Sequence, residues 1–209
     1  MESGGSKSSN EPAVLYFDED GDTRLSLTRC DPERTYVVSS KAMSLVCSAW
    51  KSMLSRNNGF KEGTLVESNC AIPLPDDDPE ALELLLNIAH MRFERIPKTL
   101  TFDDLLAVAD LTEKYGAVKI LRPWLKDWLK DIEHLVKEPG YEEWLFIAWA
   151  FGEEEIFTRL SNRLVREVHL VKDGEEYYFH RELLRTSSNI GFVQSMKCLG
   201  VATPTWASS

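Results

Sequence analysis

Short runs of apolar residues open the chain, in patterns typical of β-strands. Val14-Leu15-Tyr16-Phe17 is uninterrupted and β-prone. From Arg24 to Thr28, two leucines alternate with polar residues, which predicts a strand with one buried face. The turn residues Cys30-Asp31-Pro32-Glu33 precede another β-prone run at Thr35 to Val38. These last two runs are therefore predicted to pair as a hairpin.

The spacing of apolar residues becomes helical at Ser39. Two short helices are predicted there, the second capped by Ser48. Their apolar positions are Ala42, Met43, Val46, Trp50, Met53 and Leu54. A short strand is predicted at Ala71 to Leu74, where Pro75 ends it.

Three longer helices are predicted in the middle of the chain. Asp78-Pro79 starts the first, because it combines a capping acceptor with a proline in the first turn. Thr101, followed three residues later by Asp104, resembles a capping box and starts the second. The third runs from Ile120 to Ile132. The helices are expected to share one core, made of Trp50, Met53, Leu54, Leu85, Leu105, Val108, Tyr115 and Leu125.

Pro139-Gly140 is the clearest boundary in the sequence. Beyond it, Tyr141 to Phe151 is apolar on most sides, which predicts a buried helix. A further helix is predicted from an apolar stripe at Ile156, Leu160, Leu164 and Val168. The predicted organisation is a disordered tail at 1–12, a domain at 13–133, a helical extension at 139–200 and a frayed tail at 201–209.

The composition and charge narrow the class of protein. Hydrophobic residues make up 43% of the 209 residues, which is enough for a core. The net charge of −10 opposes binding to phosphate backbones and anionic lipids, so direct nucleic-acid binding is not expected. The longest apolar run, Trp144 to Phe151, is too short to span a membrane, and the N-terminus lacks the apolar core of a signal peptide. We expect an intracellular protein, in the cytoplasm or nucleus, that does not bind membranes.

Residues that bind metals or perform catalysis are scattered. The cysteines, Cys30, Cys47, Cys70 and Cys198, lack the spacing of a zinc motif, so neither metal nor cofactor is expected. The acidic clusters Asp76-Asp77-Asp78 and Asp103-Asp104 are interpreted as helix caps rather than acid–base pairs. The chain is therefore expected not to be an enzyme. The rival in that class is a small hydrolase of unfamiliar fold, which a deep pocket with a titratable group of shifted pKa would favour.

Three stretches carry motifs in a consistent order. The first, Asp18 to Leu54, contains an Asp-Gly-Asp turn, an alternating strand, Val38-Ser39-Ser40-Lys41 leading into a helix, and Ser48-Ala49-Trp50-Lys51-Ser52-Met53-Leu54. The second runs from Ile72 to Leu86, and the third from Leu105 to Ala117 contains Ala109-Asp110-Leu111-Thr112-Glu113-Lys114-Tyr115. Together they resemble the BTB/POZ family, particularly its filamentous-fungal members, over about residues 18–133. Trp50 stands where the family usually has phenylalanine.

The resemblance implies an α+β fold, in which a BTB/POZ-like cluster of helices packs around a small β-sheet, followed by an α-helical extension. It implies a non-enzymatic protein–protein interaction scaffold or adaptor. The alternatives are a substrate adaptor of a cullin-type ubiquitin ligase and a transcriptional regulator that acts through partners. Family dimers use the first helices and the segment before the first strand. The corresponding candidate homodimer interface is Val14, Leu15, Tyr16, Phe17 and Met43.

Two points refine these expectations. The apolar run at Val14 to Phe17 has an alternative interpretation, in which it folds back on its own domain as an extra strand. Family members that bind a cullin often carry a hydrophobic-x-Glu motif after the third long helix, and Met91, Phe93 and Glu94 form the matching candidate partner-docking loop. Arg92 occupies the hydrophobic position, which argues against a cullin as the partner. A second binding surface of an adaptor is expected in the helical extension.

Overall fold

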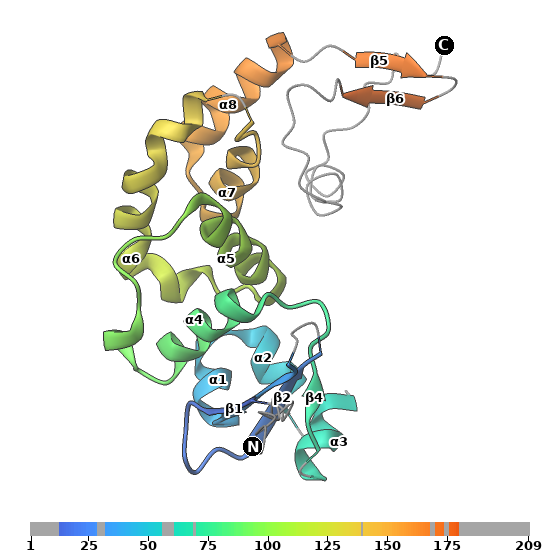
Figure 1. The fold of residues 1–209 in the computed structure, drawn as a ribbon, viewed down its shortest axis with the longest axis vertical. Helices are drawn as coiled ribbons and strands as arrows, with labels where there is room; N and C mark the ends of the chain where they lie inside the picture. The colour runs from blue at the N-terminus through green and yellow to red at the C-terminus, as the bar shows by residue number, and fades with distance from the viewer. Residues whose placement is uncertain are drawn as a thin grey trace, which may run out of the picture. The chain divides into compact units, whose positions relative to one another are not determined.

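The computed structural model describes residues 13–28, 32–55, 61–68, 70–138, 140–167, 170–173 and 176–179. Helices and a small sheet are both present, so the fold is mixed α+β (Figure 1). By packing, the chain divides into two compact units, described separately below: unit 1 comprises residues 1–96 and 115–120, and unit 2 comprises residues 97–114 and 121–209. The domain boundary expected near residue 139 stays a prediction.

The sheet of unit 1 has the strand order β1-β3-β2-β4. Its strands are β1 (Ala13–Tyr16), β2 (Thr23–Leu27), β3 (Arg34–Val38) and β4 (Ile72–Pro73). β2 and β3 pair antiparallel, which confirms the predicted hairpin. β1 pairs in parallel with β3, and β4 in parallel with β2. The strand predicted at residues 71–74 is therefore confirmed in a shorter form.

The turn that leads into β2 is tightly constrained. A Cβ atom at Gly21 would lie 2.8 Å from the carbonyl oxygen of Val38, so only glycine fits. The next residue, Asp22, accepts hydrogen bonds from the backbone N–H of Ser40 at 2.7 Å and from its hydroxyl at 2.6 Å. Burial alone would raise the pKa of Asp22, but the Ser40 hydrogen bonds outweigh it and hold that pKa below its ordinary value. This carboxylate joins the start of β2 to the helix that follows β3.

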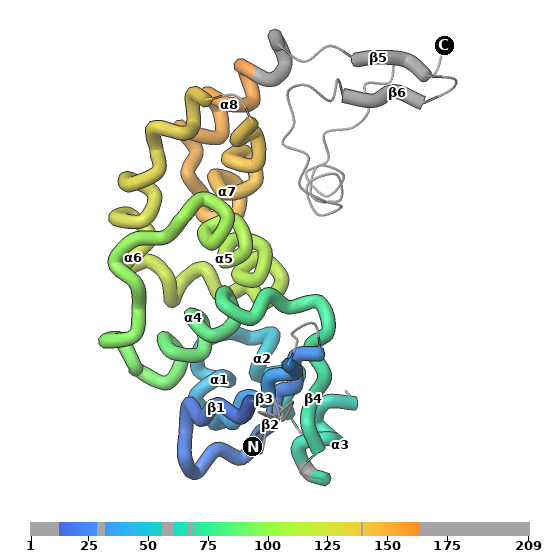
Figure 2. The backbone as a smooth tube through the Cα atoms, viewed as in Figure 1, coloured from blue at the N-terminus to red at the C-terminus, as the bar shows by residue number. Residues whose placement is uncertain are grey.

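Three short helices follow the hairpin. They are α1 (Ser40–Val46), α2 (Ser48–Met53) and α3 (Lys61–Glu67). α1 contacts both α2 and the later helix α4 (Pro79–Ala89). The cap of α2 was predicted as Ser48, but it is Cys47, whose sulfur accepts from the backbone N–H of Trp50 at 3.5 Å. The prediction also missed α3, which contacts β4 at the edge of the sheet (Figure 2). Its central Gly63 weakens the helical pattern.

Helix α4 (Pro79–Ala89) begins as predicted. Asp78 caps it, with its side chain accepting from the backbone N–H of Ala81 at 2.9 Å. The predicted apolar face is buried, at Leu82, Leu85, Leu86 and Ala89. The buried Tyr36 of β3 donates to Glu83 of α4 at 2.7 Å, and burial followed by this acidic neighbour raises the Tyr36 pKa. Arg34 also reaches Glu83, at 3.1 Å, so β3 and α4 are joined by a polar network.

The remaining helices are η1 (Phe93–Arg95), α5 (Phe102–Tyr115), α6 (Val118–Ile132), η2 (Glu133–Lys137), α7 (Trp144–Phe151) and α8 (Glu154–Glu167). The predicted capping box of α5 is confirmed: the Asp104 N–H donates to the Thr101 hydroxyl at 3.2 Å, and the Thr101 N–H donates to the Asp104 carboxylate at 3.3 Å. Gly116, with φ of 66°, ends α5 as a left-handed residue.

Two expectations for the C-terminal part need correction. The helix expected from Tyr141 begins at Trp144. The region expected to be wholly helical also contains β5 (Leu170–Asp173) and β6 (Glu176–Phe179), which pair antiparallel. The run from Tyr177 to Phe179 is β-prone. β6 has four residues, which is enough for a strand but too few to show the periodicity of a helix. Of the predicted apolar stripe, Leu160 is buried, whereas the side chains of Leu164 and Val168 lie outside the described residues.

The residues predicted to share one core fall in both units. Trp50, Leu54, Leu85 and Tyr115 belong to unit 1, whereas Leu105, Val108 and Leu125 belong to unit 2. All seven are buried, and Met53 is half-buried. Within unit 1, Tyr115 packs on Trp50 at 5.2 Å between ring centroids and donates to the buried Asp77 at 2.6 Å. Apolar spacing therefore predicted the buried faces, but it does not identify what covers each face.

Candidate interaction surface

The C-terminus of α4 makes a sharp turn that exposes a methionine. The backbone N–H of Met91 donates to Ile88 at 3.1 Å, and that of Arg92 donates to Asn87 at 2.8 Å. These two bonds form a Schellman motif, whose left-handed position is usually glycine. Here Met91 takes that position with φ of 59°, and its side chain is 74% exposed. Of the non-glycine residues that the structure describes, Met91 alone has positive φ.

His90 and Arg92, on either side of Met91, attach this turn to the rest of unit 1. The Nε2 atom of His90 accepts from the backbone N–H of Ser39 at 2.9 Å, and its Nδ1 lies 2.8 Å from the carbonyl oxygen of Leu86. An imidazole that accepts at Nε2 donates at Nδ1, so these contacts define one neutral tautomer. The turn after α4 is therefore fixed to the start of α1.

Arg92 extends from the same turn to β1. Its guanidinium Nη1 donates to the carbonyl oxygen of Tyr16 at 2.8 Å. The guanidinium carbon lies 5.4 Å from the ring centroid of Phe17, within the range of a cation–π contact. The Phe17 ring also packs against His90 at 5.9 Å and edge-on against Tyr36 at 5.5 Å. β1 and the loop after α4 are thus joined, although they are far apart in the sequence.

The two joined segments carry most of the exposed large apolar side chains among the described residues. The exposed fractions are 45% for Val14, 36% for Leu15, 53% for Tyr16, 74% for Met91 and 52% for Phe93. We call these five residues the apolar surface. Leu45 on α1 is also exposed, at 75%. Clustered exposed apolar residues mark contact sites more often than single ones do.

Two sets of residues that the sequence suggested separately lie on segments that the Arg92 bond to Tyr16 joins. Val14, Leu15 and Tyr16 came from the candidate dimer interface, and Met91 and Phe93 from the candidate docking loop. The other expected residues differ in exposure. Phe17 is 9% exposed and Met43 is 0% exposed, so both side chains belong to the core of unit 1 and add little to its surface. The Glu94 side chain is 73% exposed and lies 4.0 Å from Arg95.

The structural role of Arg92 was not predicted from the sequence. Arg92 was recognised only as an unusual residue in the docking loop. In the structure it is the side chain that connects that loop with β1, by a bond to Tyr16 across 76 positions of the chain. A long-range contact of this kind leaves no local pattern, so no signal in the sequence identifies it.

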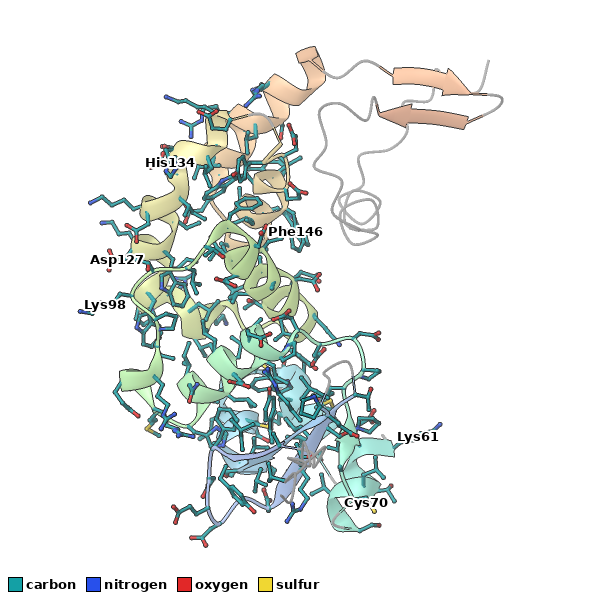
Figure 3. The ribbon with its side chains drawn as sticks, viewed as in Figure 1. Lys61, Cys70, Lys98, Asp127, His134 and Phe146 are labelled. Atoms are coloured by element: carbon teal, nitrogen blue, oxygen red, sulfur yellow. The ribbon has the colours of Figure 1, made fainter. Side chains whose placement is uncertain are left out.

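The other candidate chemistry does not assemble into a site in the described part of the chain. No group of three His, Cys, Asp or Glu residues that could hold a metal occurs there. Cys47 is buried, whereas Cys70 follows α3 and His134 lies on η2 (Figure 3). The acidic clusters act as caps at Asp78 and Asp104, as predicted. No described helix is long and apolar enough to cross a bilayer.

Comparison with known proteins adds no assignment. No model of a known protein family matches the chain, and no curated protein matches it.

Proposed function

We propose that the chain is a non-enzymatic protein–protein interaction scaffold or adaptor of the BTB/POZ type, and that it binds through the apolar surface. The observation that carries the proposal is the exposure of Tyr16, Met91 and Phe93 on two segments that Arg92 holds together. Apolar area left in water costs about 25 cal/mol per Å² relative to burial. A partner that covers these side chains recovers that free energy.

The conformation of Met91 supports a contact role. A left-handed conformation costs a residue with a Cβ atom about 1–2 kcal/mol relative to the right-handed one, and glycine avoids most of this cost. The exposed Met91 side chain contributes little burial to compensate. Strained residues of this kind cluster at functional positions. A methionine side chain is also well suited to a contact surface, since it is flexible and polarisable.

The geometry of β1 favours contacts through side chains over addition of a strand. The Phe17 N–H donates to Val37 of β3 at 2.9 Å, so the preceding Tyr16 carbonyl points away from β3. Arg92 already donates a hydrogen bond to that carbonyl oxygen. A partner strand would have to displace it, whereas the side chains of Val14 and Tyr16 are already accessible. β1 also joins its own sheet, as in the fold-back interpretation, while all four side chains stay exposed.

Both self-association and binding to another protein are compatible with this surface. Self-association follows from the resemblance to BTB/POZ dimers. A cullin partner is disfavoured, since Arg92 is directed to Tyr16 and Phe17 and offers no hydrophobic side chain beside Glu94. Regulation of transcription through partners stays an alternative that shares the same surface.

The test removes the apolar surface in two ways, of which only the substitutions leave the core intact, because the truncation also removes Phe17. Sedimentation velocity at about 50 μM, a concentration that detects micromolar dimers, is run on the full chain and on a chain that begins at Asp18. The same measurement, with quantitative affinity purification from cells, is applied to Met91→Ser/Phe93→Ser. Leu45→Ser is the matched control, since it removes one exposed apolar side chain from α1.

We expect the double substitution to abolish a dimer or a reproducible set of bound proteins, and the control to retain them. A full-length monomer whose bound proteins are unchanged by Met91→Ser/Phe93→Ser would refute the proposal. Circular dichroism and melting temperature establish that each variant is folded.

A further inference from the structure

A small pocket lies in unit 2 between η2 and α8. Its volume is about 260 Å³. The lining residues are Val136, Lys137, Arg159, Leu160 and Arg163. Pockets for cofactors and drug-sized ligands usually hold about 300–1,000 Å³. This pocket is therefore suited to one or two side chains rather than to a complete cofactor.

The pocket is cationic in a strongly acidic chain. Three of its five described lining residues are Lys137, Arg159 and Arg163, whereas the chain carries a net charge of −10. No acidic side chain is among the described lining residues. Glu133, outside the lining, lies 3.8 Å from Arg159. The local charge thus selects an anionic group.

Arg163 is fixed by the backbone and shapes one side of the pocket. Its Nη1 donates to the carbonyl oxygens of Val136 at 3.3 Å and Lys137 at 3.1 Å, at the C-terminal end of η2. These bonds give Arg163 a structural role, because they hold α8 against η2. They also fix its positive charge at the pocket before any ligand arrives, which lowers the cost of binding.

Arg159 is the side chain that can change partner. It and Glu133 are 51% and 53% exposed, and exposed ion pairs at such a distance contribute little to stability. Arg159 already contacts the carboxylate of Glu133, so a carboxylate of a partner protein can take the place of Glu133. Lys137 is exposed beside it and adds a further positive charge.

The floor of the pocket is apolar. Val136 and Leu160 are each 3% exposed, and they separate the cations from the interior of unit 2. A ligand with an apolar group next to its anion can therefore contact this floor, which a simple inorganic ion does not do. The combination of an apolar floor and a cationic rim is complementary to a peptide in which acidic and apolar residues are neighbours.

We propose that this pocket binds an acidic peptide segment of a partner protein, with one carboxylate held by Arg159 and Lys137 and an adjacent apolar side chain held by Val136 and Leu160. A nucleic acid or an anionic membrane is disfavoured, since many phosphates would approach a chain of net charge −10. A single carboxylate adds only one negative charge. The proposal concerns unit 2 and is independent of the apolar surface of unit 1, so either can fail without the other.

The test measures binding of a defined probe to the full chain. The probe is a fluorescent octapeptide of alternating leucine and glutamate with blocked ends, and its match has glutamine in place of glutamate. We expect the glutamate peptide to bind, and its affinity to fall with rising salt. Arg159→Glu should weaken binding by about tenfold or more, because it replaces attraction with repulsion. Arg122→Glu is the control, an equal change of charge at an exposed position of α6.

Glu133→Gln distinguishes a binding role of Arg159 from a structural one. It removes the competing carboxylate, so the affinity for the glutamate peptide should rise by up to about fivefold. Arg159→Gln, with its melting temperature, replaces Arg159→Glu if the latter fails to fold.

Four results would overturn the proposal: no binding, equal binding of the glutamine peptide, equal weakening by Arg122→Glu, or equally effective competition by inorganic phosphate or phosphatidylserine vesicles.

Discussion

β1 and β2 flank the same strand, β3, but are held there in different ways. β2 pairs antiparallel with β3 along all five of its residues, and four of its five side chains are buried. β1 pairs in parallel, and all four of its side chains are exposed. Both strands gain backbone hydrogen bonds, so the difference lies in their side chains. β2 belongs to the core of unit 1, whereas β1 adds a surface to it.

The difference shows how a sheet can carry a strand that the core does not need. The anchors of β1 are its bonds to β3, the ring of Phe17 and the bond from Arg92 to Tyr16. None of them uses the side chains of Val14, Leu15 or Tyr16, which stay accessible. The following predictions test this contrast.

The largest effect is expected from equal truncations in the two strands. Leu25→Ala in β2 removes a side chain that is 0% exposed, and it should lower the free energy of unfolding by about 2–5 kcal/mol. Leu15→Ala in β1 removes one that is 36% exposed, and its effect should stay within about 0.5–1 kcal/mol. Urea denaturation of both variants makes the measurement. Equal losses would mean that β1 belongs to the core after all.

A smaller effect is expected when the connection to β1 is cut. Arg92→Ala removes the bond to Tyr16 and the contact with Phe17, and it should cost about 1 kcal/mol. Hydrogen exchange should become faster at the Phe17 amide, which bonds to β3, and should not change at Leu25. Arg95→Ala serves as control, since the Arg95 side chain is 61% exposed and lies 4.0 Å from Glu94. Unchanged exchange at Phe17 would show that β1 does not depend on Arg92.

Met91→Gly should have an effect of opposite sign. Glycine adopts φ of 59° without the steric cost of a Cβ atom, so the free energy of unfolding should rise by up to about 1 kcal/mol. Met91→Ala keeps the Cβ atom and should give no such gain. If the glycine variant also loses a bound partner, stability and binding are in conflict at this position. A glycine variant of lower stability would contradict the strain assigned to Met91.

The smallest effect on stability is expected at Asp22, in the turn before β2, and it depends on pH. The pKa of Asp22 is lowered from 3.8, so its contribution to stability is complete above that value and is lost as the pH falls through the lower pKa of the folded state. Asp22→Asn should therefore be less stable than the wild type near neutral pH, and the difference should shrink below about pH 4. Denaturation at a series of pH values measures it. A difference that grows on acidification would contradict the hydrogen bonds to Ser40.

Sequence patterns predicted the parts of the fold that local chemistry determines. The β2–β3 hairpin follows from alternation and a turn, and the start of α4 follows from the acceptor and proline at Asp78-Pro79. The capping box at Thr101 and Asp104 is another local device. α3 was not predicted, because its apolar pattern is short and is interrupted by Gly63.

The candidate site was predictable only in part. The apolar character of Val14 to Tyr16 and of Met91 is visible in the sequence. The burial of Met43 is not, since it depends on α1 packing against α4. The pocket in unit 2 could not be predicted either, because Lys137 and Arg159 lie on different elements and form no motif in the sequence.

The strand order has a consequence for synthesis on the ribosome. β1 emerges before its partner β3, and β2 pairs with β3 as soon as the hairpin is complete. β1 therefore meets an edge that already exists, and the Arg92 bond to Tyr16 must wait until 76 more residues have been translated. Until then, β1 lacks the bond from Arg92 and is held by its bonds to β3 and by the ring of Phe17. A chaperone or a second nascent copy has its best access to β1 during that interval.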